Sequence, residues 1–373
     1  MATRRKRCSD GRYESSIRYE KPDGTRGRLP VYGRTNAELE RQLHEKRERL
    51  LKGAPVRDSS ATLREWLEEW RPTFLRASDR AHATKNLYAR LTTNWVEPSI
   101  GNIRLDRLKP SDITRMLLAV EDAGLAGSTR RSVYAALRGA LEDAVNNELL
   151  KDTPAKRVKR PRADRTEARS LTPEEVARLL KGAEGLRYLT ALKLILGTGL
   201  RRGEALALRW EDVDLDRGEA RVRGTLVRQD DGPLEVVKPK TARSRRVASL
   251  SPSVVALLKV HRARQLEERL KASNLWHDKG YVFATEFGQP VDPRNLRRAV
   301  QIAARKAELG EGIGVHTLRH TYATTALLGG VPIHVVGQNL GHSSIAITAD
   351  IYGHLTDEAS KSAAETVSAA FGL

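Results

Sequence analysis

The basic stretch at residues 151–169 restricts how this chain of 373 residues can fold more than any other feature. It holds eight Lys or Arg against three Asp or Glu, two prolines and almost no large apolar side chain. Because such a segment has little to bury, it divides the chain into separately folding parts. We predict a linker here, which either lies extended along a phosphate backbone or serves as a solvated hinge.

The whole chain carries 66 Lys and Arg against 47 Asp and Glu, a formal net charge of +19. A surplus of this size favours a polyanionic partner, most simply nucleic acid, and argues against a neutral metabolic enzyme. At about 100 to 200 residues per domain, the length predicts two or three domains. The 39% of hydrophobic residues can form their cores.

Cysteine content and hydropathy indicate the compartment. Cys8 is the single cysteine, so no internal disulfide can form and no oxidising compartment is required. No apolar run approaches the roughly 18 residues of a membrane span. The basic start MATRRKR leads into polar residues instead of a signal core. We therefore expect a soluble protein of the cytoplasm.

The N-terminal segment reads as a small basic sheet followed by one helix. Short β-type runs at 13–19 and 28–32 flank a Pro-Asp-Gly turn signal at 22–24. A helical pattern capped by Thr35 or Asn36 comes next.

Residues 60–150 follow a helical pattern throughout. Apolar residues recur at helical spacing in the sequence Leu63, Trp66, Leu67, Trp70 and Phe74. We expect four helices, with Ser111 and Ser128 as N-caps, and assign the tryptophans to the core instead of nucleotide stacking. From residue 170 onward, helices flank a β-rich interlude at 220–250. Two of them begin with caps, at Thr172 in LTPEE and at Ser251 in SPSVV. The fold class is therefore mainly α with small β elements.

Two motifs in the C-terminal half concentrate cations. GTGLRRGEALALRW places Arg201 at a helix start, three residues before Glu204, where the guanidinium and the helix N-terminus both favour an anion. VKPKTARSRRVASL gathers cations on a strand-turn-strand pattern, namely Lys238, Lys240, Arg243, Arg245 and Arg246. A basic hairpin can bring an ammonium group next to a bridging phosphate oxygen. Taken singly, both motifs are better explained as ordinary surface charge.

Two further motifs add histidines and a tyrosine. HTLRHTYATTALLGGV presents three polar residues on nearby helix faces, His316, Arg319 and His320. This histidine spacing is similar to that of zinc proteases, but Thr317 stands where their glutamate is needed, so we expect no metal site. NLGHSSIAITADIYGHL has His342 ten residues before Tyr352. Tyr352 is either a core residue or the nucleophile of this cluster, which offers no other good one.

Together these groups suit attack on a phosphodiester. A phenol with a pKa of about 10 must lose its proton to attack, and the phosphoryl oxygens gain charge in the transition state. Two arginines with the histidines answer both needs without magnesium, and no acidic triad that could hold two metal ions is evident. We choose Lys240 to protonate the leaving sugar oxygen.

The order Arg, Lys, His-x-x-Arg, His, Tyr resembles the tyrosine recombinase (phage integrase) family, in particular three-domain integrases of temperate phages and integrative elements. The matching motifs are TGLRRGE at 198–204, KT at 240–241, HTLRH at 316–320, LGHSS at 340–344 and DIYGHL at 350–355. Each motif is modest alone, but all five in the family's order and spacing are very specific. The resemblance covers most of the chain.

The resemblance implies a role for each matching residue. Arg201 and Arg319 would bind the scissile phosphate, and Lys240 would be the general acid. His316 and His342 would assist proton transfer and phosphate bonding, and Tyr352 would attack. Glu204 and His320 would support the catalytic residues without contacting the phosphate themselves. We also expect DNA contacts from basic side chains of the linker and the second motif, namely Lys156, Arg157, Lys159, Arg160, Lys238, Arg243 and Arg245.

The resemblance also implies the domain organisation. Residues 1–57 would form an arm-type DNA-binding domain of one sheet and one helix, and residues 60–150 a helical, SAM-like domain that binds core sites. The linker at 151–169 would lead to a mixed α/β catalytic domain at 170–373. Its C-terminal tail would dock either on a neighbouring protomer or on its own domain.

The implied activity is site-specific recombination for integration and excision of a phage or mobile element in a bacterial cell. Strands would be exchanged through a 3′-phosphotyrosyl intermediate and a Holliday junction, on a DNA-bound tetramer, with no cofactor. DNA-bending or excision factors are possible further partners. A type IB topoisomerase shares the tyrosine chemistry, but the separate basic N-terminal segment and LGHSS argue against it. A non-catalytic DNA-binding descendant would have no reason to keep all six catalytic residues.

Overall fold

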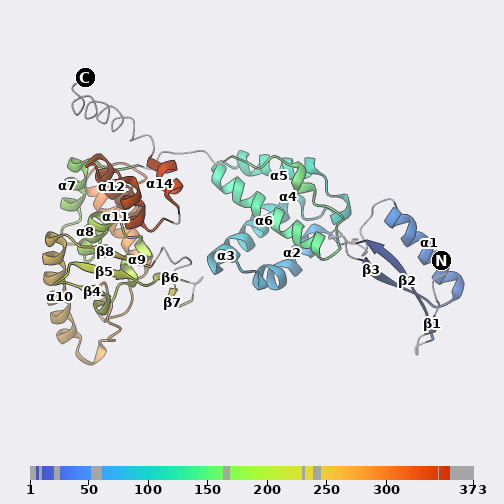
Figure 1. The fold of residues 1–373 in the computed structure, drawn as a ribbon, viewed down its shortest axis with the longest axis horizontal. Helices are drawn as coiled ribbons and strands as arrows, with labels where there is room; N and C mark the ends of the chain where they lie inside the picture. Colours follow the sequence, from blue (N-terminus) through green and yellow to red (C-terminus); the bar gives the residue numbers. More distant parts are fainter. Residues whose placement is uncertain are drawn as a thin grey trace, which may run out of the picture. The chain divides into compact units, whose positions relative to one another are not determined.

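The computed structural model describes residues 6–7, 11–20, 26–51, 61–162, 169–228, 232–237, 245–342 and 344–352. The chain divides into two compact units, Met1–Arg165 and Thr166–Leu373. Helices dominate both units, and the strands are few and short, as the sequence predicts (Figure 1). No helix in the described ranges is long and apolar enough to cross a membrane.

The first unit begins with a small antiparallel sheet in the order β1-β2-β3, and one helix packs on it. The strands are β1 Lys6–Arg7, β2 Tyr13–Glu20 and β3 Arg26–Gly33, and the helix is α1 Asn36–Leu51. Ile17 and Val31 of the sheet are buried against Leu39 and Leu43 of the helix. The Thr35 hydroxyl accepts the Glu38 backbone N–H at 3.1 Å, so Thr35 is the cap. The turn at 22–24 lies outside the described residues.

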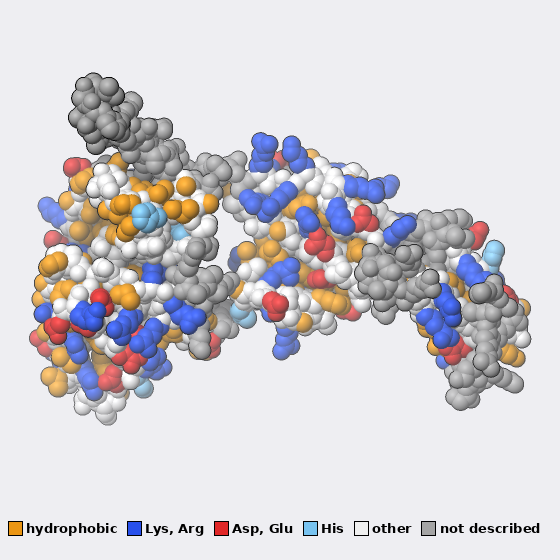
Figure 2. Space-filling view, in the orientation of Figure 1, with side chains coloured by type: hydrophobic (Ala, Val, Ile, Leu, Met, Phe, Trp, Pro, Cys, Tyr) orange, Lys and Arg blue, Asp and Glu red, His pale blue; other side chains and the backbone are white. Residues whose placement is uncertain are grey.

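Residues 61–162 form a helical segment with its own core. Its helices are α2 Leu63–Trp70, α3 His82–Leu91, α4 Glu97–Ile100, α5 Pro110–Asp122 and α6 Gly127–Asn146. Trp66 and Trp70 are fully buried, and their indole N–H groups donate to the Ala140 carbonyl at 2.8 Å and to Asp143 at 2.7 Å. These tryptophans are core residues, as predicted. Figure 2 shows Lys and Arg side chains over much of the visible face of this segment, together with some Asp and Glu.

One sequence prediction for this segment is confirmed and one is wrong. Its helices form four continuous runs, as expected, because the π-helical residues Thr92–Val96 join α3 to α4 without a break. Ser111 and Ser128 lie inside the first turns of α5 and α6 and are not N-caps. At α5 the cause is Pro110, whose fixed φ suits the first helical position, while Asp112 accepts the Lys109 backbone N–H at 2.9 Å.

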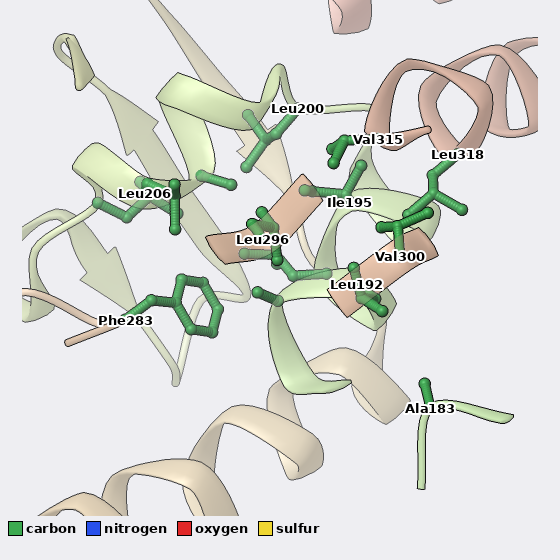
Figure 3. Close-up of a cluster of buried hydrophobic side chains, with 14 of the residues drawn as sticks. Ala183, Leu192, Ile195, Leu200, Leu206, Phe283, Leu296, Val300, Val315 and Leu318 are labelled. Atoms are coloured by element: carbon green, nitrogen blue, oxygen red, sulfur yellow. The ribbon is translucent and has the colours of Figure 1, made fainter. Parts of the chain in front are cut away.

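The second unit packs helices around two small sheets. Its helices are α7 Pro173–Gly182, α8 Leu189–Thr198, α9 Arg202–Ala207, α10 Pro252–Ala272, α11 Pro293–Lys306, α12 Val315–Leu328, α13 Ile333–Leu340 and α14 Ile345–Tyr352. Thr172 and Ser251 cap α7 and α10, as predicted. Helix α8 lies in the core, where Leu192 and Ile195 pack with Val300 of α11 and with residues of α12 (Figure 3).

The strands of this unit are β4 Val213–Asp214, β5 Glu219–Val222, β6 Thr225–Arg228, β7 Leu234–Val237 and β8 Arg246–Ser249. The predicted hairpin across residues 238–244 is wrong, because β7 pairs with β6 whereas β8 pairs with β5. Ala248 of β8 is buried opposite Ala220 of β5, and this burial selects the β4-β5-β8 sheet. Residues 238–244 themselves lie outside the described residues.

Candidate active site

A glycine turn at the end of α8 presents Arg201. Gly199 has a φ of +67°, in the left-handed region that favours glycine. A Cβ at this position would lie 2.5 Å from the Tyr322 ring and 2.9 Å from a Leu340 methyl group. The turn therefore requires glycine on two grounds, and it brings the chain to Arg201, the residue before α9.

Glu204 holds two arginines behind this turn. It is 3% exposed, and its carboxylate accepts the Arg201 backbone N–H at 2.9 Å and the Arg201 Nη1 at 2.8 Å. Arg246 Nη2 and Nη1 donate to the two carboxylate oxygens at 2.9 and 3.3 Å. Burial alone would raise the Glu204 pKa, but the bonds and charges of Arg246 and Arg201 outweigh it and leave the pKa below its usual value. Glu204 therefore stays ionised and fixes both guanidinium groups.

Arg319 projects from α12 toward the same place. The residue is 5% exposed, and its Nη1 and Nη2 donate to the carbonyls of Gly199 at 2.6 Å and Leu340 at 2.7 Å. Arg201 Nη2 donates to the next carbonyl, that of Gly341, at 3.1 Å. The two guanidinium groups thus meet at the C-terminal end of α13, although 118 residues separate them in sequence.

His342 lies next to these two arginines, directly after Gly341 at the end of α13. Gly341 ends α13 with a φ of +65°, and His342 Nδ1 lies 2.9 Å from the Thr348 hydroxyl on α14. Burial and the charges of Arg319 and Arg201 lower the His342 pKa to about 4. The imidazole is therefore neutral at physiological pH and serves as a hydrogen-bonding group beside the two arginines.

His316 and His320 lie one turn apart on α12. Loss of solvation and the positive charges of Arg319, Arg202 and Arg201 lower the His316 pKa. Loss of solvation, followed by the neighbouring His316 and Arg319, lowers the His320 pKa. The structure therefore brings together six of the residues selected from the sequence, namely Arg201, Glu204, His316, Arg319, His320 and His342.

The nucleophile candidate is placed only through its helix. Tyr352 is the last residue of α14, one turn after Thr348, and its side chain lies outside the described part of the chain. Helix α14 packs closely on α13, since a Cβ on Gly337 would lie 2.9 Å from the Thr348 hydroxyl. Thr348 is fully buried at this contact.

The remaining predicted residues belong to two basic segments of the sequence. Lys238, Lys240 and Arg243 lie outside the described residues, and Arg245 is exposed just before β8. In the first unit, four linker residues have exposed side chains: Lys156, Arg157, Lys159 and Arg160. Lys156 pairs with Asp152 at 2.9 Å.

The sequence pattern places Arg246 only among the cations of the basic strand-turn-strand motif and gives no role to Thr348. A signal for Arg246 was present, because β8 alternates and Arg246 shares a face with Ala248, which is buried. No sequence spacing predicts the contact of Thr348, because Thr348 lies in α14 whereas its partner His342 follows the end of α13.

Comparisons with known proteins agree with this geometry. Residues 169–359 match the model of the phage integrase family. The chain is 31% identical over 363 residues to a XerC-like tyrosine recombinase of Caldanaerobacter subterraneus, with 92% of each chain covered.

Solved structures show the same fold. The integrase of transposon Tn1549 in complex with a circular intermediate DNA has a TM-score of 0.70 and 21% identity, covering 83% of this chain and 100% of that one. The lambda integrase tetramer bound to a Holliday junction has a TM-score of 0.61 and 17% identity, covering 93% and 94%.

Proposed function

The chain belongs to the phage integrase family of tyrosine recombinases, and we propose that it cuts and rejoins DNA at the arginine cluster next to His342. Membership makes it a site-specific recombinase, in preference to a type IB topoisomerase or a non-catalytic DNA-binding protein. The observation that carries the assignment to this cluster is the pair of guanidinium groups fixed on the consecutive carbonyls of Leu340 and Gly341.

This pair can bind one phosphodiester. Within the described residues, the bonds of Arg201 use two of its five N–H donors, so donors remain for the non-bridging oxygens of a phosphate. Arg319 brings a second positive charge to the same place. Fixed cations at this point neutralise the charge that grows on the phosphoryl oxygens, which is how such sites lower a barrier.

The proposed reaction proceeds in two exchanges at phosphorus. The Tyr352 phenol gives its proton to a neutral histidine of the cluster and attacks, forming a 3′-phosphotyrosyl bond, while the bond to the 5′ oxygen breaks and that oxygen takes a proton from Lys240. A 5′-hydroxyl of the partner strand then gives its proton to Lys240 and attacks the same phosphorus, and the released tyrosine takes its proton back from the histidine. His342 and His316 hydrogen-bond the phosphate oxygens or assist these proton transfers, and the phosphotyrosyl bond conserves the energy for rejoining.

The packing of α14 supports attack within one subunit. Helix α14, which carries Tyr352, is held to α13 of the same chain through Gly337, Thr348 and His342. Contacts within one chain therefore hold the tyrosine's own helix against the helix whose end binds the two arginines.

We further propose how the chain engages DNA. The relatives of known structure include one in complex with a circular intermediate DNA and a tetramer bound to a Holliday junction. By analogy, this chain acts as a homotetramer on double-stranded attachment sites, with residues 60–150 on core sites and residues 1–57 on arm sites. The exposed cations of the linker, such as Arg157 and Arg160, contact the phosphate backbone.

The biological role that fits is integration and excision of a phage or other mobile element in the bacterial cytoplasm. DNA-bending and excision factors would set the direction. The flanks of the integrated element contain the crossover site, visible as a short duplicated segment, and provide the substrate for the tests below.

Trapping the covalent intermediate tests the proposed chemistry. Wild-type protein incubated with a nicked attachment-site duplex in a metal chelator should form an adduct that survives denaturing electrophoresis. Tyr352→Phe should abolish the adduct, because the attacking oxygen is gone. Tyr281→Phe is the matched control, since Tyr281 lies in the same unit against Arg209 and should not matter. Adduct formation by the Tyr352 variant would refute the assignment.

A further inference from the structure

The C-terminal end of α13 is held by three arginines from three different elements. The last carbonyls of a helix have no partner within it and carry the negative end of its dipole, so cations bind well there. The bonds are Arg246 Nε to the Asn339 carbonyl at 2.7 Å, Arg319 Nη2 to the Leu340 carbonyl at 2.7 Å and Arg201 Nη2 to the Gly341 carbonyl at 3.1 Å. We call these three side chains the α13 clamp.

Arg246 differs from the other two members of the clamp. Its side chain is only 8% exposed, and Nε, Nη1 and Nη2 each donate to a protein group, either Asn339 or Glu204. It also packs under Gly341, where a Cβ would lie 2.7 Å from Nη1. Arg246 therefore cannot bind a phosphate without giving up these bonds.

The position of Arg246 connects the two halves of the phosphate site. On one side it fixes Glu204, which holds the backbone and side chain of Arg201. On the other side it fixes the last turn of α13, which binds Arg201 and Arg319 and leads into His342. Without Arg246, the Glu204 carboxylate is free to turn and pair fully with Arg201, which would draw that guanidinium away from the phosphate.

We propose that Arg246 is a positioning residue for DNA strand cleavage, which sets the spacing of Arg201 and His342 by tying Glu204 to the end of α13. This inference rests on the proposed function of the site. Arg246 also begins β8, six residues after Lys240 in the sequence, so the same clamp anchors the strand that follows the general acid.

The first test is Arg246→Lys in single-turnover cleavage of a nicked attachment-site duplex. Lysine keeps the charge, but its ammonium group cannot donate hydrogen bonds to both Glu204 carboxylate oxygens and to the Asn339 carbonyl at the same time. We expect cleavage to slow by about 100-fold, the loss typical of a misplaced catalytic group. DNA affinity should stay within about threefold, because the charge that attracts phosphate is kept.

Arg187→Lys is the matched control. Arg187 makes the same set of bonds in the same unit, forking Glu268 at 2.6 and 3.1 Å and donating to the Ala284 carbonyl. It should lower the melting temperature about as much as Arg246→Lys while leaving the cleavage rate of the folded protein unchanged. Equal loss of cleavage in both variants would show that Arg246 is merely structural.

A neutral linkage separates positioning from general damage. In a methylphosphonate at the scissile position, one charged non-bridging oxygen is replaced by a methyl group, so less charge needs neutralising. If Arg246 acts through the guanidinium groups, the deficit of Arg246→Lys should shrink at least tenfold on this substrate. The same deficit on both linkages would overturn the proposal.

Glu204→Gln weakens the same Arg246–Glu204 ion pair by removing the negative charge. This variant can replace Arg246→Lys in the test if Arg246→Lys does not fold. It should show the same partial recovery on the neutral linkage, and a full cleavage rate in this variant would also overturn the proposal. Failure of the proposed function would look different, because the wild-type protein itself would then form no adduct on the ordinary phosphodiester.

Discussion

At the scale of single residues, the arginine cluster next to His342 holds its carboxylate and its imidazole in fixed charge states. Glu204 stays ionised because Arg246 and Arg201 bond it, whereas His342 stays neutral because it is partly buried and the charges of Arg319 and Arg201 lie close by. The buried carboxylate offsets part of the positive charge concentrated here. In the function we propose, the scissile phosphate would offset the rest.

The lowered pKa values of the histidines predict how the stability of the folded protein depends on pH. In the unfolded chain a histidine has a pKa of about 6.5, whereas the folded protein lowers the pKa of His342 to about 4 and also lowers those of His316 and His320. Between these values the unfolded state binds more protons, so stability falls as pH falls below about 6.5. Thermal melts from pH 7 to pH 5 should show this loss.

His342→Asn is the control for that prediction. It removes one of the groups that resist protonation, so its melting temperature should fall less steeply over the same pH range. An unchanged slope would mean that the pKa of His342 is not lowered in the folded protein.

At the scale of elements, the helices could be predicted and their long-range partners could not. Apolar spacing and the caps Thr172 and Ser251 locate helices from local sequence alone. The predicted strand pairing was wrong. Strand β8 pairs with β5 because Ala248 is buried opposite Ala220, which lies 28 positions earlier in the sequence. The Arg246 bonds to Glu204 and Asn339 were missed for the same reason. The order of the motifs in the sequence was enough to identify the other site residues, but it did not predict the distances between them.

The turn between α8 and α9 gives a prediction at this scale. Gly199→Ala should destabilise the protein by more than the roughly 1–2 kcal/mol of left-handed backbone strain, because its Cβ would also clash with Tyr322. Gly185→Ala is the matched control, since Gly185 has a φ of +77° but nothing within 4 Å of a Cβ. Urea unfolding measures both. Equal losses would contradict the clash and leave backbone strain as the whole effect.

At the scale of the whole molecule, the excess charge lies mainly outside the catalytic unit. Residues 1–60 carry 16 Lys or Arg against 9 Asp or Glu, and the linker at 151–169 adds eight against three. These segments are suited to hold DNA by its backbone, which gives salt-dependent affinity without base readout. The catalytic unit then needs only a local arrangement of cations at one phosphate.

Removing residues 1–57 tests this division of labour. We expect the shortened chain to lose affinity for arm-site duplexes while cleaving core-site duplexes nearly as well as the full chain. Gel-shift binding and adduct formation, measured on the two duplexes in parallel, give the comparison. A matching loss on both would mean that the N-terminal segment supports the rest of the protein instead of a separate DNA site.

Mass spectrometry of the trapped protein–DNA adduct tests the central claim most directly. After nuclease and protease digestion, the account predicts a residual 3′-linked nucleotide on the phenol oxygen of Tyr352, formed without metal and absent when Arg319 is replaced by alanine. A nucleotide attached to any other side chain, or an adduct that forms equally well without Arg319, would contradict it.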